Sequence, residues 1–360
     1  MFSYLIRRLL LMLPTLLGIT VVVYVAMAAT PGGIGATLIG RDSNIDPRVR
    51  KAMEEYLNKR YGLNRPAYER YFIWLNKVSP IGVKERGSGF PASWSFGFKS
   101  PDLGESFIKR RAVLDMIGES LPVTLLLNCI SFPIIYGLAI WSGIRAGAGR
   151  GKTFDRVSGT VFLGLWSFPT ILAGTLAIGF LASDRYLRWF PTNGLTDIFA
   201  DDMRFLPSFG SSGFERGYLL DVVWHLVLPV LCLSYGSFAV LSKLARGAIL
   251  ENINMDYART ARAKGLSEKV VLYRHVLRNS LLPLITVASG ILPAMLSGAL
   301  IVETIFGLPG MGRLAVEAVQ QKDPELVLSI TLLSGLLGLI GYLLADIGYA
   351  IADPRVSYER

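Results

Sequence analysis

The chain is poor in charged residues and in the residues that bind metals. Only 18% of its 360 residues are charged, 52% are hydrophobic, and the mean hydropathy is +0.45. A soluble domain has about a quarter charged residues, so the composition excludes an ordinary soluble protein. The two histidines and two cysteines are scattered along the chain and lack the ligand spacing of a four-ligand zinc site. Cys129 and Cys232 both fall inside apolar runs, where a packing role is favoured over a disulfide.

Six long apolar runs divide the chain. None contains Asp, Glu, Lys or Arg, and each reaches the roughly 20 residues that a helix needs to cross a ~30 Å hydrocarbon core. Only helices satisfy their own backbone hydrogen bonds in lipid, so we expect an all-α integral membrane protein with six transmembrane helices. The runs are Leu9–Ala29, Leu121–Ile144, Val157–Ser183, Val222–Ser242, Asn279–Val302 and Leu326–Ala345.

The first run, Leu9–Ala29, follows a basic start and resembles a signal peptide. Its 21 residues without a charge exceed the length of a signal-peptide core. We therefore predict that this run is retained as the first transmembrane helix.

The net charge of +10 bears on orientation rather than on nucleic-acid binding. Lys and Arg are retained in short cytoplasmic segments, so their distribution indicates the topology. With the N-terminus inside, the cytoplasmic segments hold 16 basic and 7 acidic residues. The other side holds 21 basic residues, of which 15 lie in the long segment 30–120, and such long segments translocate largely regardless of charge. Both termini are thus predicted to be cytoplasmic (N-in, C-in).

This topology divides the chain into four parts. They are a cytoplasmic N-terminus with the first helix (1–29), a periplasmic segment (30–120), a transmembrane core with a cytoplasmic loop at 245–280 (121–350), and a cytoplasmic tail (351–360). Within the periplasmic segment we expect helices over Asp46–Arg60 and Pro66–Leu75. An ordered loop or lid is expected over Ser79–Pro101, and Ile108–Ser120 is expected to lie along the outer face of the bilayer before the second span.

The cytoplasmic loop Ala245–Ser280 is the most informative stretch. Asp256–Lys264 has a helical pattern rich in Ala and Arg, and Gly265 ends it. Ser267 is a suitable N-cap for a second helix that runs to about Asn279. The loop is too polar to enter lipid, so we expect a helix, a glycine turn and a second helix in the cytoplasm. We call Ala245–Ser280 the candidate coupling segment.

The composition of this segment allows two interpretations. It is a docking element if its small alanines let another protein approach the backbone and its basic side chains attract an acidic surface. Alternatively, it only follows the orientation rule and contacts anionic lipid. The residues concerned are Ala258, Ala261 and Ala263, and Arg259, Arg262 and Lys264.

The order of residues from Tyr257 to Leu266 (YARTARAKGL) resembles the EAA loop of binding-protein-dependent ABC importers. It is especially similar to the form found in the oligopeptide/dipeptide/nickel permease family. The general pattern is Glu-Ala-Ala, three residues, Gly, nine residues, then Ile-x-Leu-Pro. The matching positions are Ala261, Gly265 and Leu277. Four positions differ from the general pattern in the way that is typical of the peptide permeases of the family. They are Arg259, Thr260, His275 and Arg278.

The resemblance covers nearly the whole chain and points to the subunit with a long periplasmic segment after its first span. Lys77–Pro101 has no match in the family pattern, and the residues of Asp323–Ser329 differ from those usual in the family. The other similar stretches are Tyr4–Arg8, Arg60–Leu63, Asp102–Phe107, Ile301–Leu314, Ala345–Ala350 and Asp353–Arg355.

The resemblance implies a type I ABC importer permease with a MetI-like core, a multi-pass subunit of the bacterial inner membrane without a catalytic site or cofactor of its own. Its implied partners are a homologous second permease, two ATP-binding subunits that bind ATP and Mg, a periplasmic or lipid-anchored substrate-binding protein, and the lipid bilayer. Peptides or peptide-like solutes would cross between the two permeases, with oligopeptides ranked first. The implied ATPase-coupling residues are Tyr257, Ala258, Arg259, Thr260, Ala261, Arg262, Ala263, Lys264 and Gly265.

The stretch from Ala146 to Thr153 (AGAGRGKT) nearly matches the sequence motif of a phosphate-binding loop. It lacks the first glycine and lies in a short turn between two apolar runs, whereas a phosphate-binding loop needs a strand before it and a helix after it. We predict a flexible, basic cytoplasmic turn and no nucleotide site here.

Two other function classes fit the sequence less well. A secondary transporter driven by an ion gradient usually carries charged residues within its spans, and the six runs have none. A membrane-embedded enzyme would need Asp, Glu, His or Ser gathered at one membrane depth. Glu303 and Asp346 lie at the ends of spans, where a helix-end or packing role is favoured.

Overall fold

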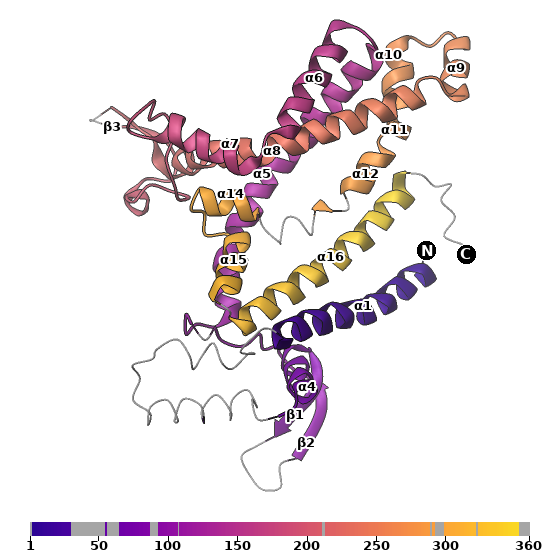
Figure 1. The fold of residues 1–360 in the computed structure, drawn as a ribbon. Helices are drawn as coiled ribbons and strands as arrows, with labels where there is room; N and C mark the ends of the chain where they lie inside the picture. The colour runs from indigo at the N-terminus through magenta and orange to yellow at the C-terminus, as the bar shows by residue number, and fades with distance from the viewer. Residues whose placement is uncertain are drawn as a thin grey trace. The chain divides into compact units, whose positions relative to one another are not determined.

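The computed structural model is mostly helical (Figure 1). It falls into two compact units. Unit 1 contains Met1–Ile6, Glu119–Leu314 and Leu337–Arg360, and unit 2 contains Arg7–Gly118 and Ala315–Leu336. The structure describes residues 2–29, 55, 65–86, 93–106, 108–210, 213–288, 290–291, 299–321 and 323–352. The expected helix over Asp46–Arg60 lies outside the described residues, Glu55 excepted.

The elements follow one another in a simple order. In the first part of the chain they are α1 (Phe2–Ala29), α4 (Ala67–Val78), β1 (Ile81–Arg86), β2 (Ser93–Phe98), α5 (Val113–Ala148), α6 (Thr153–Ser167), α7 (Thr170–Ala177) and the π-helix η1 (Ile178–Ala182). The 3₁₀ turn η2 (Ala200–Asp202), β3 (Ser208–Gly210), β4 (Gly213–Glu215) and α8 (Gly217–Asn252) come next. The last part holds α9 (Asp256–Ala263), α10 (Glu268–Val270), the π-helix η3 (Val271–Val276), α11 (Leu277–Ser280), α12 (Leu282–Ala288), α14 (Leu300–Ile305), α15 (Met311–Gln321) and α16 (Pro324–Ala352).

Four helices of the described residues, α1, α5, α8 and α16, are long and apolar enough to cross a membrane. The helices α6 and α7 add a fifth span if they are counted together, but they are bent by 88°. The expected run Val157–Ser183 is therefore not one straight helix. Phe168 has an extended backbone (φ −88°, ψ 120°) because the ring of Pro169 disfavours the helical conformation of the residue before it. Part of the expected run Asn279–Val302 lies outside the described residues.

One expectation for the segment after the first helix is wrong. Ser79–Pro101 is not simply a loop, because β1 and β2 pair there as an antiparallel hairpin, with Ile81 opposite Phe98. Part of Ile108–Ser120 is helical, because α5 begins at Val113 and continues to Ala148, and its place along the outer face of the bilayer stays a prediction. Val113, Met116, Ile117 and Ser120 are all buried, and their helical spacing explains why the helix starts early. The helix expected over Pro66–Leu75 is confirmed as α4.

Unit 2 packs α4 against α1 and the start of α16. Tyr24, Tyr71, Trp74 and Leu328 belong to one buried cluster. The hydroxyl groups of Tyr71 and Thr20 share a buried hydrogen bond of 2.8 Å. This contact joins a helix that follows the long hydrophilic segment to the apolar helix α1.

The Asp102–Phe107 stretch, which resembles the permease family, contacts the divergent Asp323–Ser329 stretch within unit 2. The hydroxyl of Ser106 donates to Oδ2 of Asp323 at 2.5 Å, and the hydroxyl of Ser329 donates to the carbonyl of Leu103 at 3.1 Å. The other carboxylate oxygen of Asp323 accepts the N–H of Leu326 at 3.3 Å, so Asp323 caps α16 ahead of its proline. Asp323 therefore serves both as the N-cap of α16 and as the acceptor of the Ser106 hydroxyl.

Ser106→Ala is expected to destabilise unit 2 by about 1–3 kcal/mol, because it leaves a buried carboxylate oxygen without its donor. Ser106 and Asp323 are 2% and 1% exposed, so water does not replace the lost bond. Thermal unfolding of the detergent-solubilised protein, followed by circular dichroism, measures the effect. Ser100→Ala, at an exposed serine of the same unit, is the matched control. Equal melting temperatures for the two variants would refute the role of this bond.

Candidate functional site

The helices α5 and α8 cross at close range where the candidate coupling segment begins. A Cβ on Gly143 would collide with Ala245, and a Cβ on Gly147 would lie 2.5 Å from Cγ2 of Ile249. One turn away, the hydroxyl groups of Ser142 and Ser242 share a buried hydrogen bond of 2.7 Å. The spacing Gly143-x-x-x-Gly147 is the small-residue pattern that lets membrane helices approach, a signal that our reading of the sequence missed.

The turn between α9 and α10 is built around Gly265. Its φ is +80°, a conformation that glycine adopts without the penalty that other residues incur. The N–H of Gly265 donates to the carbonyl of Arg262 at 2.9 Å, and the N–H of Leu266 donates to the carbonyl of Ala261 at 3.3 Å. These two bonds form a Schellman motif, which ends α9 and turns the chain into the next helix. The predicted helix, glycine turn and second helix are confirmed, although Ser267 makes no side-chain capping bond.

A small apolar core attaches this helical pair to α5 and α8. Its buried members are Ile144 of α5, Ile249 of α8, Ala258 and Ala261 of α9, and Val271 and Val276 of η3. The expectation that Ala258 and Ala261 leave room for another protein is wrong, because they are 0% and 5% exposed and face the chain itself. Small residues are needed at these positions because α9 lies close to η3 and the end of α8. Ala263 alone of the three alanines is exposed.

Polar contacts add to this core. The guanidinium of Arg262 donates to the carbonyl of Ile253 at 3.1 Å and to both carboxylate oxygens of Glu268, at 2.6 and 3.3 Å. The hydroxyl of Tyr257 donates to the side chain of Asn252 at 2.7 Å. Much of the charge of Arg262 is thus used within the segment, so it is less available to a partner than expected.

The outward face of the segment is polar and positively charged. Arg259 is 70% exposed and lies 3.4 Å from Asp256 on the same helix. Thr260, Ala263, Lys264 and Gly265 are also exposed, and nothing lies within 4 Å of a Cβ placed on Gly265. Of the nine predicted coupling residues, the structure therefore presents five at the surface and uses Ala258 and Ala261 for internal packing.

The contact between Arg262 and Glu268 also determines how the segment responds to acid. Hydrogen bonds from the Arg262 guanidinium hold the pKa of Glu268 below its ordinary value of 4.5. A carboxylate with a lowered pKa stabilises the fold above its unfolded-state pKa and loses that contribution as the pH falls through the folded-state value. The contact is therefore intact at neutral pH and weakens only in acid.

Arg262→Ala is expected to accelerate amide hydrogen exchange in Asp256–Ala263, because the helix loses its bonds to Ile253 and Glu268. Arg259→Ala is the matched control, since it removes the same charge from an exposed position on the same helix. Hydrogen-exchange mass spectrometry of the purified protein compares the two variants. If they exchange equally fast, Arg262 does not hold α9 in place.

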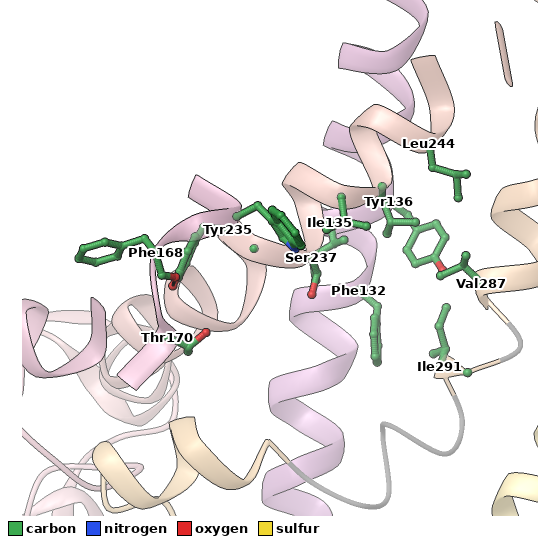
Figure 2. A pocket seen from close by; sticks show the side chains of 15 residues that line it. Phe132, Ile135, Tyr136, Phe168, Thr170, Tyr235, Ser237, Leu244, Val287 and Ile291 are labelled. Atoms are coloured by element: carbon green, nitrogen blue, oxygen red, sulfur yellow. Dashed lines mark hydrogen bonds between the residues drawn. The ribbon is translucent and has the colours of Figure 1, made fainter. Parts of the chain in front are cut away.

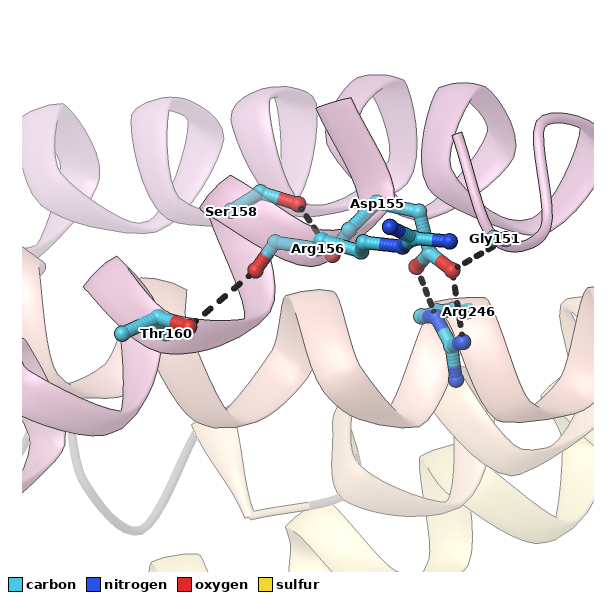
Figure 3. A network of polar contacts seen from close by, with 6 residues as sticks. All are labelled: Gly151, Asp155, Arg156, Ser158, Thr160 and Arg246. Atoms are coloured by element: carbon cyan, nitrogen blue, oxygen red, sulfur yellow. Dashed lines mark hydrogen bonds and ion pairs between the residues drawn. The ribbon is translucent and has the colours of Figure 1, made fainter. Parts of the chain in front are cut away.

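An ion pair connects α6 to α8 near the same end of these helices (Figure 3). Both carboxylate oxygens of Asp155 accept hydrogen bonds from the guanidinium of Arg246, with 2.9 Å between Nη2 and Oδ2. Oδ2 also accepts the N–H of Gly151 at 2.9 Å, which holds the turn before α6. The helices α6 and α8 lie side by side (Figure 1), and Phe162 packs edge-on against Phe238 further along them. The ends of α5, α6 and α8 are thus linked to the candidate coupling segment.

The second family-like stretch, Ile301–Leu314, surrounds a carboxylate. Glu303 is fully buried, and its Oε1 accepts the hydroxyl of Thr124 at 2.9 Å and the N–H of Ala299 at 3.0 Å. Its Oε2 accepts the N–H of Arg313 at 3.0 Å in the first turn of α15. A Cβ on Gly310 or Gly312 would collide with this carboxylate or with the backbone of Leu300. The packing role expected of Glu303 is confirmed, and the carboxylate explains why glycines flank Met311.

A cavity of about 580 Å³ lies between α5, the bend from α6 to α7, α8 and the end of α12. Figure 2 shows Phe132 and Tyr136 of α5 around it together with Val287 and Ile291. The hydroxyl of Tyr136 is buried and has no hydrogen-bond partner among the described residues. Aromatic walls with few polar groups suit an apolar or amphipathic solute rather than an ion.

Two family models match the chain. The model described as "Binding-protein-dependent transport system inner membrane component" matches residues 136–358, and the model for the N-terminal part of such membrane components matches residues 1–128. The chain belongs to this family. It is a permease subunit of an ABC importer in the inner membrane, and the comparisons give no support to a secondary transporter.

The permease is similar to curated relatives along its full length. It is 34% identical over 360 residues to the oligopeptide transport system permease protein AppB of Bacillus subtilis, with 99% of this chain and 100% of the relative covered. It is 31% identical over 363 residues to the di/tripeptide transport system permease protein DppB of Pseudomonas aeruginosa, with 100% of both covered. It is also 28% identical over 361 residues to the glutathione transport system permease protein GsiC of Escherichia coli, again with 100% of both covered.

Proposed function

We propose that this permease translocates peptides or peptide-like solutes, and that the candidate coupling segment transmits the movements of an ATP-binding subunit to α5 and α8. The observation that carries the proposal is the attachment of α9 and η3 to Ile144 and Ile249 through one buried core. Because packed interfaces shift as rigid bodies, a force on α9 would move the ends of both helices together. The exposed face of Arg259, Thr260 and Lys264 is the surface available to the partner.

The proposed arrangement has six transmembrane helices with both termini in the cytoplasm. Residues 1–29 contain the first helix, 30–120 the periplasmic segment, 121–350 the permease core, and 351–360 the cytoplasmic tail. The distribution of Lys and Arg supports this orientation. The proposed partners are a homologous second permease, two ATP-hydrolysing subunits and a substrate-binding protein, which are the parts that a binding-protein-dependent importer requires.

A peptide substrate is supported by the relatives and by the aromatic cavity. The relatives named above are described as oligopeptide, di/tripeptide and glutathione permeases. The cavity lined by Phe132, Tyr136 and Tyr235 combines apolar walls with a few hydroxyl groups, which suits a chain of amide bonds with mixed side chains. Oligopeptides are our first choice of substrate.

Reconstitution tests this function. The permease, purified with a partner permease and ATP-binding subunits and placed in proteoliposomes, should take up a labelled oligopeptide only when ATP and the binding protein are supplied. Deleting Asp256–Lys264 should abolish uptake and the stimulation of ATP hydrolysis. Uptake that continues without ATP under an ion gradient would refute the proposal.

Orientation is tested separately with Lys264→Cys. A membrane-impermeant thiol reagent should label this variant in inside-out vesicles and not in intact cells. The parent chain, which contains Cys129 and Cys232, gives the background labelling. Labelling from the periplasm would refute the proposed topology.

A further inference from the structure

A second cavity, of about 480 Å³, lies where α5 ends and α6 begins. Three segments line it: the last turns of α5, the turn that leads into α6, and η3 of the candidate coupling segment. Its principal lining residues are Trp141, Ile144, Arg145, Lys152, Phe154 and Tyr273. The cavity thus adjoins both the end of a membrane-spanning helix and the coupling segment.

Aromatic rings hold the guanidinium of Arg145 in this cavity. Its Cζ lies 4.6 Å from the centre of the Phe154 ring and 5.6 Å from that of Trp141, and these rings pack edge to face. Stacking engages the flat face of a guanidinium and leaves the N–H groups on its edge available. Arg145 is therefore held in position to donate hydrogen bonds to phosphate oxygens.

The positive charge of the cavity is not neutralised within the described part of the chain. No Asp or Glu there lies within 4 Å of the side-chain nitrogens of Arg145 or Lys152. Asp155, the acidic residue of this turn, is 7% exposed and is already bound by Arg246 and Gly151 (Figure 3). A ligand for this cavity should therefore carry negative charge.

The rest of the lining indicates that the ligand also has an apolar part. Ile144 and Leu272 contribute apolar side chains, while Trp141 is 54% exposed and Tyr273 is 58% exposed. Exposed Trp and Tyr next to basic residues at the end of a spanning helix are typical of the level of lipid headgroups. We propose that this cavity binds the phosphate of an anionic phospholipid of the cytoplasmic leaflet, with its glycerol and first acyl carbons against Ile144 and Leu272.

The proposal rests on the proposed orientation, which places this end of α5 in the cytoplasm. Because Tyr273 belongs to η3, a bound lipid would contact both α5 and the candidate coupling segment. The lipid would then stabilise the arrangement through which the ATP-binding subunit moves α5.

Native mass spectrometry of the full-length chain tests the proposal. The detergent-solubilised protein is titrated with phosphatidylglycerol and with phosphatidylcholine of the same acyl chains. Two basic residues beside an anionic headgroup favour it electrostatically, so we expect a preference of at least about 10-fold for phosphatidylglycerol. The double variant Arg145→Gln with Lys152→Gln should lose this preference, while Arg145→Lys should retain part of it.

A matched double variant separates this cavity from general surface charge. Lys269→Gln with Arg278→Gln removes two exposed basic residues of the candidate coupling segment that do not line the cavity, and it should keep the preference. Lys152→Gln alone changes only an exposed turn, so it should fold normally. It should lose part of the lipid preference even if the variants of Arg145 fail to fold. Equal lipid preference in the wild type and the cavity variant would overturn the proposal, as would equal losses in the two double variants.

Two further measurements show whether the bound phosphate belongs to a lipid, to free inorganic phosphate or to another protein. Inorganic phosphate at millimolar concentration should not displace phosphatidylglycerol, and displacement would indicate a site for the free anion. Addition of the ATP-binding subunits should leave the lipid bound, whereas its release would assign the cavity to that protein. Uptake in proteoliposomes is measured in parallel, so that normal ATP-driven uptake without any lipid preference refutes this inference and leaves the proposed function standing.

Discussion

Gly265→Pro is expected to abolish ATP-driven uptake while the protein still inserts into the membrane. Proline cannot adopt the φ of +80° found at this position, and it lacks the N–H that donates to the carbonyl of Arg262. A proline in an incompatible position costs more than about 1 kcal/mol. The turn between α9 and α10 must then rearrange, and we expect uptake to fall at least about 10-fold, the factor that corresponds to ~1.4 kcal/mol.

A series at Gly265 separates backbone conformation from clearance for a partner. Asn tolerates a positive φ, so Gly265→Asn should keep most of the activity, whereas Gly265→Ala should lose part of it. Gly265→Trp has the same backbone strain as the alanine variant and adds only bulk. Nothing in the described chain lies within 4 Å of the new Cβ, so a larger loss for Trp than for Ala would report contact with another subunit.

Uptake and ATP hydrolysis are measured together in proteoliposomes, with membrane insertion checked by the amount of purified protein. The uncoupled variants should be recovered in normal amounts and transport little. Normal ATP-driven uptake by Gly265→Pro would contradict the proposed role of the candidate coupling segment.

Glu303→Ala is expected to have the largest effect on stability. It leaves the hydroxyl of Thr124 and the N–H groups of Ala299 and Arg313 without their acceptor, and all three lie around a fully buried side chain. Each unsatisfied buried group costs about 1–3 kcal/mol, so the total loss should be several kcal/mol. The melting temperature of the detergent-solubilised protein should fall sharply, and the yield should fall with it.

Glu303→Gln gives a graded test of the same site. Its amide oxygen can keep the two bonds at the Oε1 position, but its NH₂ group would face the N–H of Arg313, which is also a donor. The glutamine variant should therefore lie between the wild type and Glu303→Ala. Glu251→Ala, at an exposed acid at the end of α8, should leave the melting temperature unchanged. A mild effect of Glu303→Ala would show that the carboxylate does not hold α15 in place.

The part of the site that could be predicted from the sequence is the part determined by local chemistry. The helix, glycine turn and second helix were readable because glycine favours a positive φ and the flanking residues favour helices. The three positions that match the family pattern, Ala261, Gly265 and Leu277, are a buried alanine, the turn glycine and a half-buried leucine. Of the departing positions, Arg259, Thr260 and Arg278 are exposed and His275 is half-buried.

The hairpin of β1 and β2 and the bend at Pro169 were missed for different reasons. Trp94, Phe96 and Phe98 alternate with small residues, but the Gly and Ser content of the stretch suggested a loop. Proline is tolerated inside transmembrane helices, and α1, α5 and α8 contain it without a break in the helix. Hydropathy therefore does not distinguish Pro169, where the chain turns by 88°, from the others.

The sequence by itself determined that this protein lies in a membrane, which segments are apolar enough to cross it, and where the candidate coupling segment turns, because these properties depend on composition and on single-residue conformational preferences. Only the tertiary structure decided that Ala258 and Ala261 face inward, that Arg262 binds Glu268, and that the glycines beside Met311 make room for Glu303. Each of these contacts joins residues whose neighbours are set by how helices pack against one another. Spacing along the chain does not specify that packing.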